Sequence, residues 1–371
     1  MKLQILQENL EKAVNITARF ASTKAQLPIL GNILISAESS KIYVSSTNLE
    51  ISASVQVGAK VEEKGEISIP AKVISELISN LPKETITLSS EKEQLKVSTS
   101  GFSSTVLGME TSDFPKIPNS ITREKSMVFP KGEIVKALGQ VSFATSVDET
   151  RPILTGVLFV FDKKSLSLVA TDGFRLSRKK IPFSYEGKTP ENVVVPKGVL
   201  GELVRGVFED EEILFGLQEK EKQVVFGVGN TVLTSRLLEG EYPDFERIIP
   251  KSSGISVLLD KEELLRATKL ASIFARESAN VIKLKILNGS VKISGESGAA
   301  GSQETKVDAK IEGAISPDGF EIAFNYRFVE DFLHSASGEE IKMEFTNVAS
   351  PGIFTDTSDS NYLHLIMPVK I

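Results

Sequence analysis

Side chains able to perform chemistry are few and scattered in this sequence. Cysteine is absent from its 371 residues, which excludes disulfides, thiolate nucleophiles, zinc fingers and iron–sulfur sites. Imidazole comes only from His334 and His364, which lie 30 positions apart without an adjacent carboxylate motif, so we interpret both as ordinary side chains. Nothing near either histidine supplies a nucleophile. The sequence therefore predicts no catalytic residue, no metal and no cofactor.

Three segments could in principle hold a phosphate group or a cation. The glycine-rich stretch 295–301 has no lysine, and we interpret it as a surface loop. A lone G-x-G at 227–229 is flanked by strand patterns and is better explained as a hairpin. The acidic run 209–212 lacks the spacing of a calcium loop and is typical of a solvated turn. No G-x-S-x-G motif is present, so an enzyme is disfavoured.

Composition indicates an ordinary globular protein. The hydrophobic fraction is 41% and the charged fraction 25%, and the length favours two or three domains. No apolar stretch reaches ~18 residues and the N-terminus has no signal-peptide pattern, so we expect a cytoplasmic protein without membrane segments. The net charge of −6 argues against tight binding to nucleic acid unless basic residues gather on one face.

A similar sequence pattern repeats three times along the chain. Residues 28–30 (PIL) recur at 152–154 and residues 47–48 (TN) recur as 171–172 (TD), both 124 positions later (152 − 28 = 124). A fainter third copy includes Arg266 and Ile273. Repeats of this length are whole domains. We predict domains at 1–121, 122–249 and 250–371.

Each repeat shows the same order of local patterns. An amphipathic helix comes first, then alternating strands such as 41–46 and 165–170, and then a shorter helix after Pro70 or Pro196, where proline suits the first turn. Further strands follow, including 85–89 and 95–98. The apolar stripes of the first helices are Leu10, Val14, Ala18 and Ala21; Ile134, Leu138, Val141 and Ala144; and Leu264, Ala267, Ala271 and Phe274. The predicted class is α+β, with two helices packed on antiparallel sheets in each domain.

Four segments, in order along the whole chain, resemble one known family. They are residues 27–32 (LPILGN), 171–176 (TDGFRL), 241–245 (EYPDF) and 366–371 (IMPVKI). Together they resemble the bacterial beta sliding clamp, the processivity subunit of the replicative DNA polymerase III holoenzyme. The resemblance implies a DNA-clamp fold in which two chains join head to tail as a homodimeric ring of six domains. That ring encircles duplex DNA without sequence specificity, so a negative net charge is acceptable if the inner helices are basic.

The resemblance also implies a pocket between the second and third domains that receives short peptides. Its ligands come from the replicative polymerase subunit, the clamp loader and other proteins with a clamp-binding motif. Aliphatic walls with a methionine suit varied ligand side chains. Phe174 replaces a histidine usual in the family, and Phe328 replaces a tyrosine. The matching positions are Leu154, Thr171, Gly173, Phe174, Arg175, Leu176, Pro243, Arg247, Ile248, Phe328, Ser350, Pro351, Ile366, Met367, Pro368 and Val369.

Two further surfaces follow from the same resemblance. The expected DNA-facing cations are Lys24, Lys72, Arg151, Lys197 and Arg205. They would contact phosphates in a salt-dependent way. The expected dimer interface pairs Ile273 and Phe274 with Ser104 and Val106, and Ser104 is smaller than the apolar residue that the family has there. Strand pairing at this interface would cover sheet edges.

Two other functions remain open on the sequence alone. One is a non-catalytic three-domain scaffold that binds proteins without encircling DNA, which would be a monomer. The other is a hydrolase or transferase whose site matches none of the motifs sought. Removal of residues 367–371 separates the clamp from the scaffold, because only the clamp uses the C-terminal tail in a peptide pocket.

Overall fold

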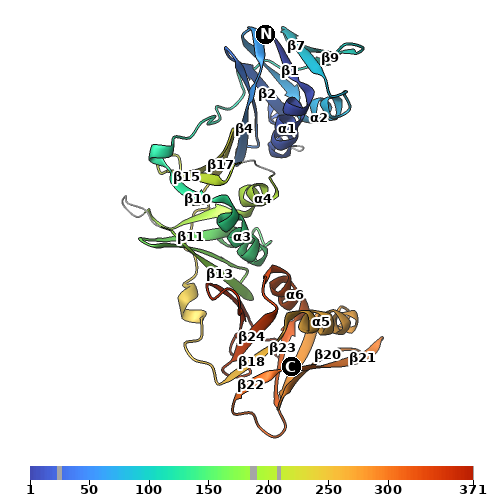
Figure 1. Cartoon of the computed structure of the whole chain (residues 1–371), viewed down its shortest axis with the longest axis vertical. Helices are drawn as coiled ribbons and strands as arrows, with labels where there is room; N and C mark the ends of the chain where they lie inside the picture. The colour runs from blue at the N-terminus through green and yellow to red at the C-terminus, as the bar shows by residue number, and fades with distance from the viewer. Residues whose placement is uncertain (23–26, 184–189, 207–209, 371) are drawn as a thin grey trace. The chain divides into compact units, whose positions relative to one another are not determined.

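The computed structural model describes residues 1–22, 27–183, 190–206 and 210–370 (Figure 1). It contains two compact units. Unit 1 comprises Met1–Gly132 and Gly198–Leu237, and unit 2 comprises Glu133–Lys197 and Leu238–Ile371. The border therefore crosses the middle repeat near the starts of α3 (Lys131–Val141) and α4 (Lys197–Arg205).

Unit 1 holds two antiparallel sheets, the helices α1 (Gln7–Thr17) and α2 (Ala71–Ser79), and α4 apart from its first residue. The smaller sheet has the order β5 (Lys60–Glu63), β1 (Lys2–Leu6), β7 (Thr85–Glu91), β8 (Gln94–Ser98) and β9 (Ser103–Leu107). The larger has the order β10 (Met127–Pro130), β15 (Glu212–Gln218), β16 (Gln223–Val228), β17 (Thr231–Arg236), β4 (Ile51–Gly58), β3 (Lys41–Thr47), β2 (Asn32–Ala37) and β6 (Gly65–Pro70). The β17–β4 pair joins strands of the middle and first repeats.

The core of unit 1 follows from alternation in the strands and from the helical stripe. Leu3 and Ile5 of β1 are buried together with Leu10 and Val14 of α1, so one apolar layer lies between sheet and helices. The Gln7 side chain donates from Nε2 to the carbonyl of Ile78 (2.8 Å). This bond ties the start of α1 to the end of α2, which lies beside it (Figure 1).

Unit 2 repeats this plan with α5 (Lys261–Ala275) and α6 (Tyr326–Ser335). Its larger sheet has the order β14 (Val193–Pro196), β11 (Gly156–Asp162), β12 (Ser165–Thr171), β13 (Arg175–Pro182), β26 (Tyr362–Ile366), β25 (Gly352–Asp356), β24 (Glu340–Phe345), β18 (Ile255–Asp260) and β22 (Lys310–Gly313). The smaller has the order β21 (Gly301–Asp308), β20 (Ser290–Ser297), β19 (Val281–Leu287) and β23 (Phe320–Asn325). Asp260 and Asn325 cap α5 and α6 by accepting backbone N–H bonds of 2.8 and 3.0 Å.

The predicted α+β class and the named strands are confirmed, with differences at helix ends. Helix α1 stops at Thr17, whose hydroxyl donates back to the carbonyl of Ala13 (2.9 Å), so Ala18 falls in a 3₁₀ turn and Ala21 lies beyond it. Helix α3 likewise ends at Val141, and Ala144 lies in the 3₁₀ turn that follows. The prolines Pro70 and Pro196 directly precede their helices, rather than lying inside the first turn.

The glycine-rich stretch 295–301 is only partly the predicted loop. Gly295 belongs to β20, where a Cβ would lie only 2.2 Å from the carbonyl oxygen of Ala271 on α5. Glycine at this position lets the helix backbone approach the sheet. The hairpin predicted at 227–229 is confirmed, since β16 and β17 pair around it. No helix within the described residues is long and apolar enough to cross a membrane.

Candidate functional site

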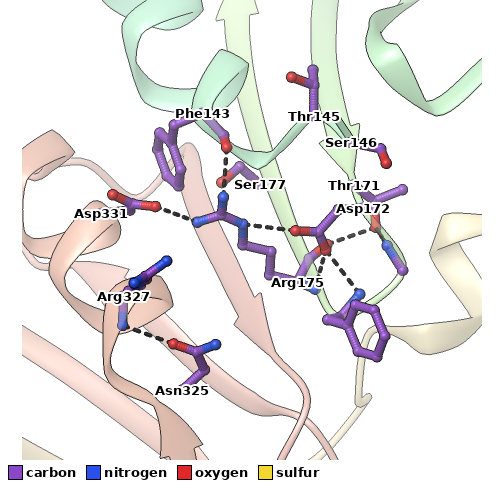
Figure 2. A network of polar contacts seen from close by, with 12 residues as sticks. Phe143, Thr145, Ser146, Thr171, Asp172, Arg175, Ser177, Asn325, Arg327 and Asp331 are labelled. Carbon is purple, nitrogen blue, oxygen red and sulfur yellow. Dashed lines mark hydrogen bonds and ion pairs between the residues drawn. The ribbon is translucent and has the colours of Figure 1, made fainter. Parts of the chain in front are cut away.

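The turn 171–175, between β12 and β13, is held by its own side chains (Figure 2). The Thr171 hydroxyl donates to the carbonyl of Arg175 (2.6 Å) and accepts from the amide of Gly173 (3.0 Å). Asp172 Oδ1 accepts from the amides of Phe174 (2.9 Å) and Arg175 (3.0 Å). Gly173 has φ +93°, which favours glycine. The turn therefore presents Phe174 outward, with 61% of its surface exposed.

The guanidinium of Arg175 is the centre of a polar network in unit 2 (Figure 2). It donates from Nε to Asp172 (3.1 Å), from Nη2 to the carbonyl of Phe143 (2.7 Å), and from Nη1 to Asp331 on α6. It also lies over the ring of Phe328 at 4.5 Å. Its side chain is 10% exposed. Arg175 thus joins the turn to α6 and to the 3₁₀ turn after α3.

The C-terminal tail runs beside this turn. Ile366, the last residue of β26, pairs with Arg175 and is fully buried. The Met367 amide then donates to the carbonyl of Phe174 (2.8 Å), and the Val369 amide donates to Ala323 (2.8 Å). Met367 and Val369 stay exposed, so the tail offers one apolar side chain next to Phe174 and a second one where it passes Ala323 of β23.

Below this surface lies an apolar cluster. Leu176 of β13 and Leu365 of β26 are buried in it. Tyr242 and Phe245, from the segment between β17 and β18, pack against it. The Tyr242 hydroxyl donates to the carbonyl of Val169 (3.4 Å), and burial raises the pKa of this phenol. The 3₁₀ turn Phe245–Ile248 is fixed on this cluster, and it is the turn that exposes Ile248.

The expected pocket residues divide by exposure. Buried positions are Leu154, Thr171, Leu176 and Ile366. Exposed positions are Gly173, Phe174, Pro243, Arg247, Ile248, Met367 and Val369. Arg175, Phe328, Ser350, Pro351 and Pro368 are half-buried. All belong to unit 2. Hydrogen bonds and a cation–ring contact join the turn, the tail and Phe328 around Arg175, while Arg247 pairs with its neighbour Asp244 (2.6 Å).

The expected DNA-facing cations occupy varied surroundings. Lys72 on α2 is exposed, and Arg205 on α4 pairs with Glu202 (2.6 Å). Arg151 pairs with Asp148 (3.0 Å) and donates to the carbonyl of Asp172 (3.4 Å). Lys24 lies outside the described residues.

Lys197, the remaining cation expected to face DNA, is exposed at the start of α4. The side chain is open to solvent along one side, but neighbouring groups partly desolvate the ammonium; this desolvation, followed by the charge of Arg175, lowers the pKa of Lys197, while Asp331 raises it. This cation therefore lies within the electrostatic reach of the Arg175 network.

Sequence reasoning missed the carboxylates that bind these arginines. Asp331 pairs with Arg175, and Glu202 pairs with both Arg205 and Arg19. A signal was present, because the two acids occupy matching positions 129 residues apart (331 − 202 = 129) in successive repeats. The repeat identified the positions but not their partners.

The four expected interface residues lie near outer strands. Ser104 and Val106 belong to β9, an outer strand of its sheet, and Val106 is buried in the core of unit 1. Ile273 on α5 is exposed and Phe274 is half-buried. A Cβ at Gly301, the first residue of outer strand β21, would lie 3.9 Å from the Phe274 ring. Each pair thus accompanies an open sheet edge.

His364 is a buried titratable group under the Arg175 network. Its Nδ1 is 2.6 Å from the Ser177 hydroxyl and its ring stacks on Phe332. Burial and then the charge of Arg175 lower its pKa to about 3, so it is neutral in the folded protein. No cluster that could hold a metal occurs among the residues that the structure describes.

Three family profiles match the chain in sequence order. Residues 1–118 match the DNA polymerase III beta subunit, N-terminal domain. Residues 129–244 match the central domain, and residues 246–370 match the C-terminal domain of the same subunit.

Individual proteins agree with these profiles. A beta sliding clamp of Staphylococcus aureus is 30% identical over 384 residues, covering 100% of this chain and 99% of the relative. A beta sliding clamp of Synechocystis is 28% identical, with 100% of each chain covered. The crystal structure of the DNA polymerase sliding clamp from Bacillus subtilis is similar with a TM-score of 0.94 and 28% identity, covering 100% of this chain and 99% of that chain.

Proposed function

The chain belongs to the DNA polymerase III beta subunit family, the beta sliding clamps, and from this premise we propose that two copies close head to tail into a ring around duplex DNA. Membership confirms the predicted resemblance and the three clamp domains. The family is a non-catalytic processivity factor, so the protein is not an enzyme. We further propose boundaries at 1–121, 122–249 and 250–371, and a cytoplasmic location.

Tethering is supported by the exposed apolar side chains of Phe174 on the turn and of Met367 and Val369 on the tail that follows β26. Backbone hydrogen bonds hold this turn and tail in place. A preorganised surface of this kind binds an extended peptide with little ordering cost. The proposed ligands are peptides of the replicative polymerase, the clamp loader and other proteins with a clamp-binding motif.

Ring closure is supported by the outer strands β9 and β21. Open edges expose unpaired backbone groups, and pairing β9 of one copy with β21 of another would satisfy them. Ser104 and Val106 would then approach Ile273 and Phe274 of the second copy. We propose that Lys24, Lys72, Arg151, Lys197 and Arg205 contact DNA phosphates, which requires no base recognition.

Retention on DNA tests the ring. The protein is loaded onto nicked circular plasmid with its cognate clamp loader and ATP, the complex is isolated, and half is linearised. We expect protein to remain on the circles and to leave linear DNA by its ends. Equal loss from both, with a loader shown to be active, would reject encirclement and favour the monomeric scaffold.

Truncation tests the peptide surface separately. Removal of residues 367–371 deletes Met367 and Val369 but leaves β26 intact, so we expect normal folding and loss of polymerase-peptide binding. The matched control removes only residues 370–371, which keeps both apolar side chains. Unchanged affinity in the longer truncation, measured by fluorescence anisotropy with a labelled peptide, would refute the assignment.

A further inference from the structure

Glu202 on α4 binds two arginines from different repeats within unit 1. Its Oε2 accepts from Nε of Arg19 (2.6 Å), which follows α1, and its Oε1 accepts from Nη2 of Arg205 (2.6 Å). The Glu202 side chain is buried, whereas Arg19 and Arg205 are 42% and 68% exposed. A fixed carboxylate therefore lies beneath two cations that reach solvent.

The same arginines line a groove between α1, α4 and the strands β4 and β17. The groove has a volume of about 530 Å³, and its charged lining residues are Lys12, Arg19, Arg205 and Asp210. Asn9, Asn15 and Asn230 add neutral polar groups to its wall. The lining thus offers several donors around one hollow, which suits a phosphate oxygen.

The charge of this groove is small because of its carboxylates. Among the residues that the structure describes, three cations, less Asp210 in the wall and Glu202 beneath it, leave a net charge of +1 (3 − 2 = +1). The two bonds to Glu202 use one N–H group of each guanidinium, and a guanidinium has five. Each arginine can therefore donate to a second acceptor while it stays paired.

We propose that this groove is a binding site for a DNA backbone phosphate and that Glu202 limits its strength. The inference rests on the proposed encirclement of duplex DNA. A buried carboxylate attracts both arginines and opposes the phosphate, so the site holds DNA weakly. Weak binding at each phosphate lets a ring move along the duplex, because topology provides the retention.

The substitution Glu202→Gln tests the proposal, because it removes the charge and keeps the shape and one acceptor. The measurement is the anisotropy of a labelled blunt duplex, short enough to thread through the ring, titrated between about 50 and 200 mM salt. We expect binding at low salt to tighten by about three- to tenfold, with the slope of log K against log salt steeper by about 0.9. Arg19→Gln weakens binding in the same assay.

The matched control is Glu212→Gln, which changes the net charge equally. Glu212 pairs with the exposed Arg123 in the same unit but does not line this groove. We expect it to leave affinity and slope near those of the unsubstituted protein. Equal behaviour of the two glutamine variants, or weaker binding by Glu202→Gln, overturns the proposal.

A second variant tests the proposal if Glu202→Gln does not fold. If thermal melting shows that Glu202→Gln is unfolded, Asp210→Asn removes an exposed carboxylate from the same groove, and binding that does not tighten overturns the proposal. Failure of the ring is recognised independently, because unsubstituted protein would then leave circular and linear DNA alike.

Discussion

The turns 47–51 and 171–175 occupy the same place in two repeats and are held by the same hydrogen bonds. In each, the threonine hydroxyl donates to the carbonyl four residues later, at 2.9 and 2.6 Å. In each, the Asn or Asp side chain accepts from the amides two and three residues later. Each turn also leads into a strand that pairs across a repeat boundary, β4 with β17 and β13 with β26.

Each strand pair, β4 with β17 in unit 1 and β13 with β26 in unit 2, forms a junction between repeats. The two junctions differ in which element provides the arginine that binds the acid. In unit 2 the turn itself provides Arg175, which reaches Asp331. In unit 1 the matching turn residue is Ile51, and the acid Glu202 receives Arg19 instead, from the position that matches Phe143 (143 − 124 = 19). The acid occupies the same position in both repeats, whereas its arginine comes from a different element in each. Position in the repeat therefore predicts the backbone better than it predicts side-chain pairing.

Loss of the cation in unit 2 is expected to have the largest effect. Arg175→Ala removes the cation that pairs with Asp172 and Asp331 and removes the contact with Phe328, at a cost of about 3 kcal/mol in the free energy of unfolding. Urea denaturation measures it. Arg247→Ala is the control, because Arg247 is 85% exposed and its pair contributes under about 0.5 kcal/mol. Similar losses in both variants would contradict the central role of Arg175.

Acid is expected to weaken the unit 2 junction through His364. Its folded pKa of about 3 lies below the ordinary 6.5, so between these values the unfolded chain binds the additional proton. Stability is therefore full above pH 6.5 and falls by about 1.4 kcal/mol per pH unit below it.

The matching pair in unit 1 has no titrating side chain, which supplies a control. Ser177 faces His364 across β13 and β26, whereas Ala53 faces Leu233 across β4 and β17. The double variant Ser177→Ala with His364→Leu copies the unit 1 pair. We expect it to lose about 2 kcal/mol less than the unsubstituted protein between pH 6.5 and 5 in urea denaturation. Parallel pH profiles would show that His364 does not titrate on unfolding.

The two turns also differ in backbone strain, and substitutions that change this strain are expected to have smaller effects on stability. Gly173 has φ +93°, and the matching Leu49 has φ +77°. Gly173→Leu is expected to cost about 1–2 kcal/mol. Leu49→Gly is expected to change stability by less than about 0.5 kcal/mol, because relief of strain is offset by greater freedom of the unfolded chain. Thermal melting of both variants checks this asymmetry, and equal costs would argue that the turns are not equivalent.

Loss of the cation in unit 1 is expected to cost less than its loss in unit 2. Arg19→Ala leaves Glu202 bound to Arg205, so the buried acid keeps one cation and the cost is about 0.5–1 kcal/mol. Urea denaturation beside Arg175→Ala gives the contrast. A cost for Arg19→Ala as large as that for Arg175→Ala would mean that Arg205 does not compensate.

The sequence predicted the repeated elements because alternation and helical spacing are local signals. The strands at 41–46 and 165–170 and the apolar stripes of the helices could be read within a few residues. The ion pairs could not, since Arg175 and Asp331 lie 156 residues apart and Arg19 and Glu202 lie 183 apart. Such partners are set by packing of distant segments. Placement of the peptide residues came from family resemblance, and stays a prediction.

The hydrogen bonds between β13 and β26 would hold two fragments of the chain together after a cut between them. Residues 175–179 pair with residues 362–366, so segments far apart in sequence are joined by backbone bonds in one sheet. A cut near Lys251, in the exposed segment before β18, leaves those bonds and the apolar cluster around Leu176 and Leu365 in place. The two fragments, 1–250 and 251–371, are therefore natural halves for reassembly after separate expression.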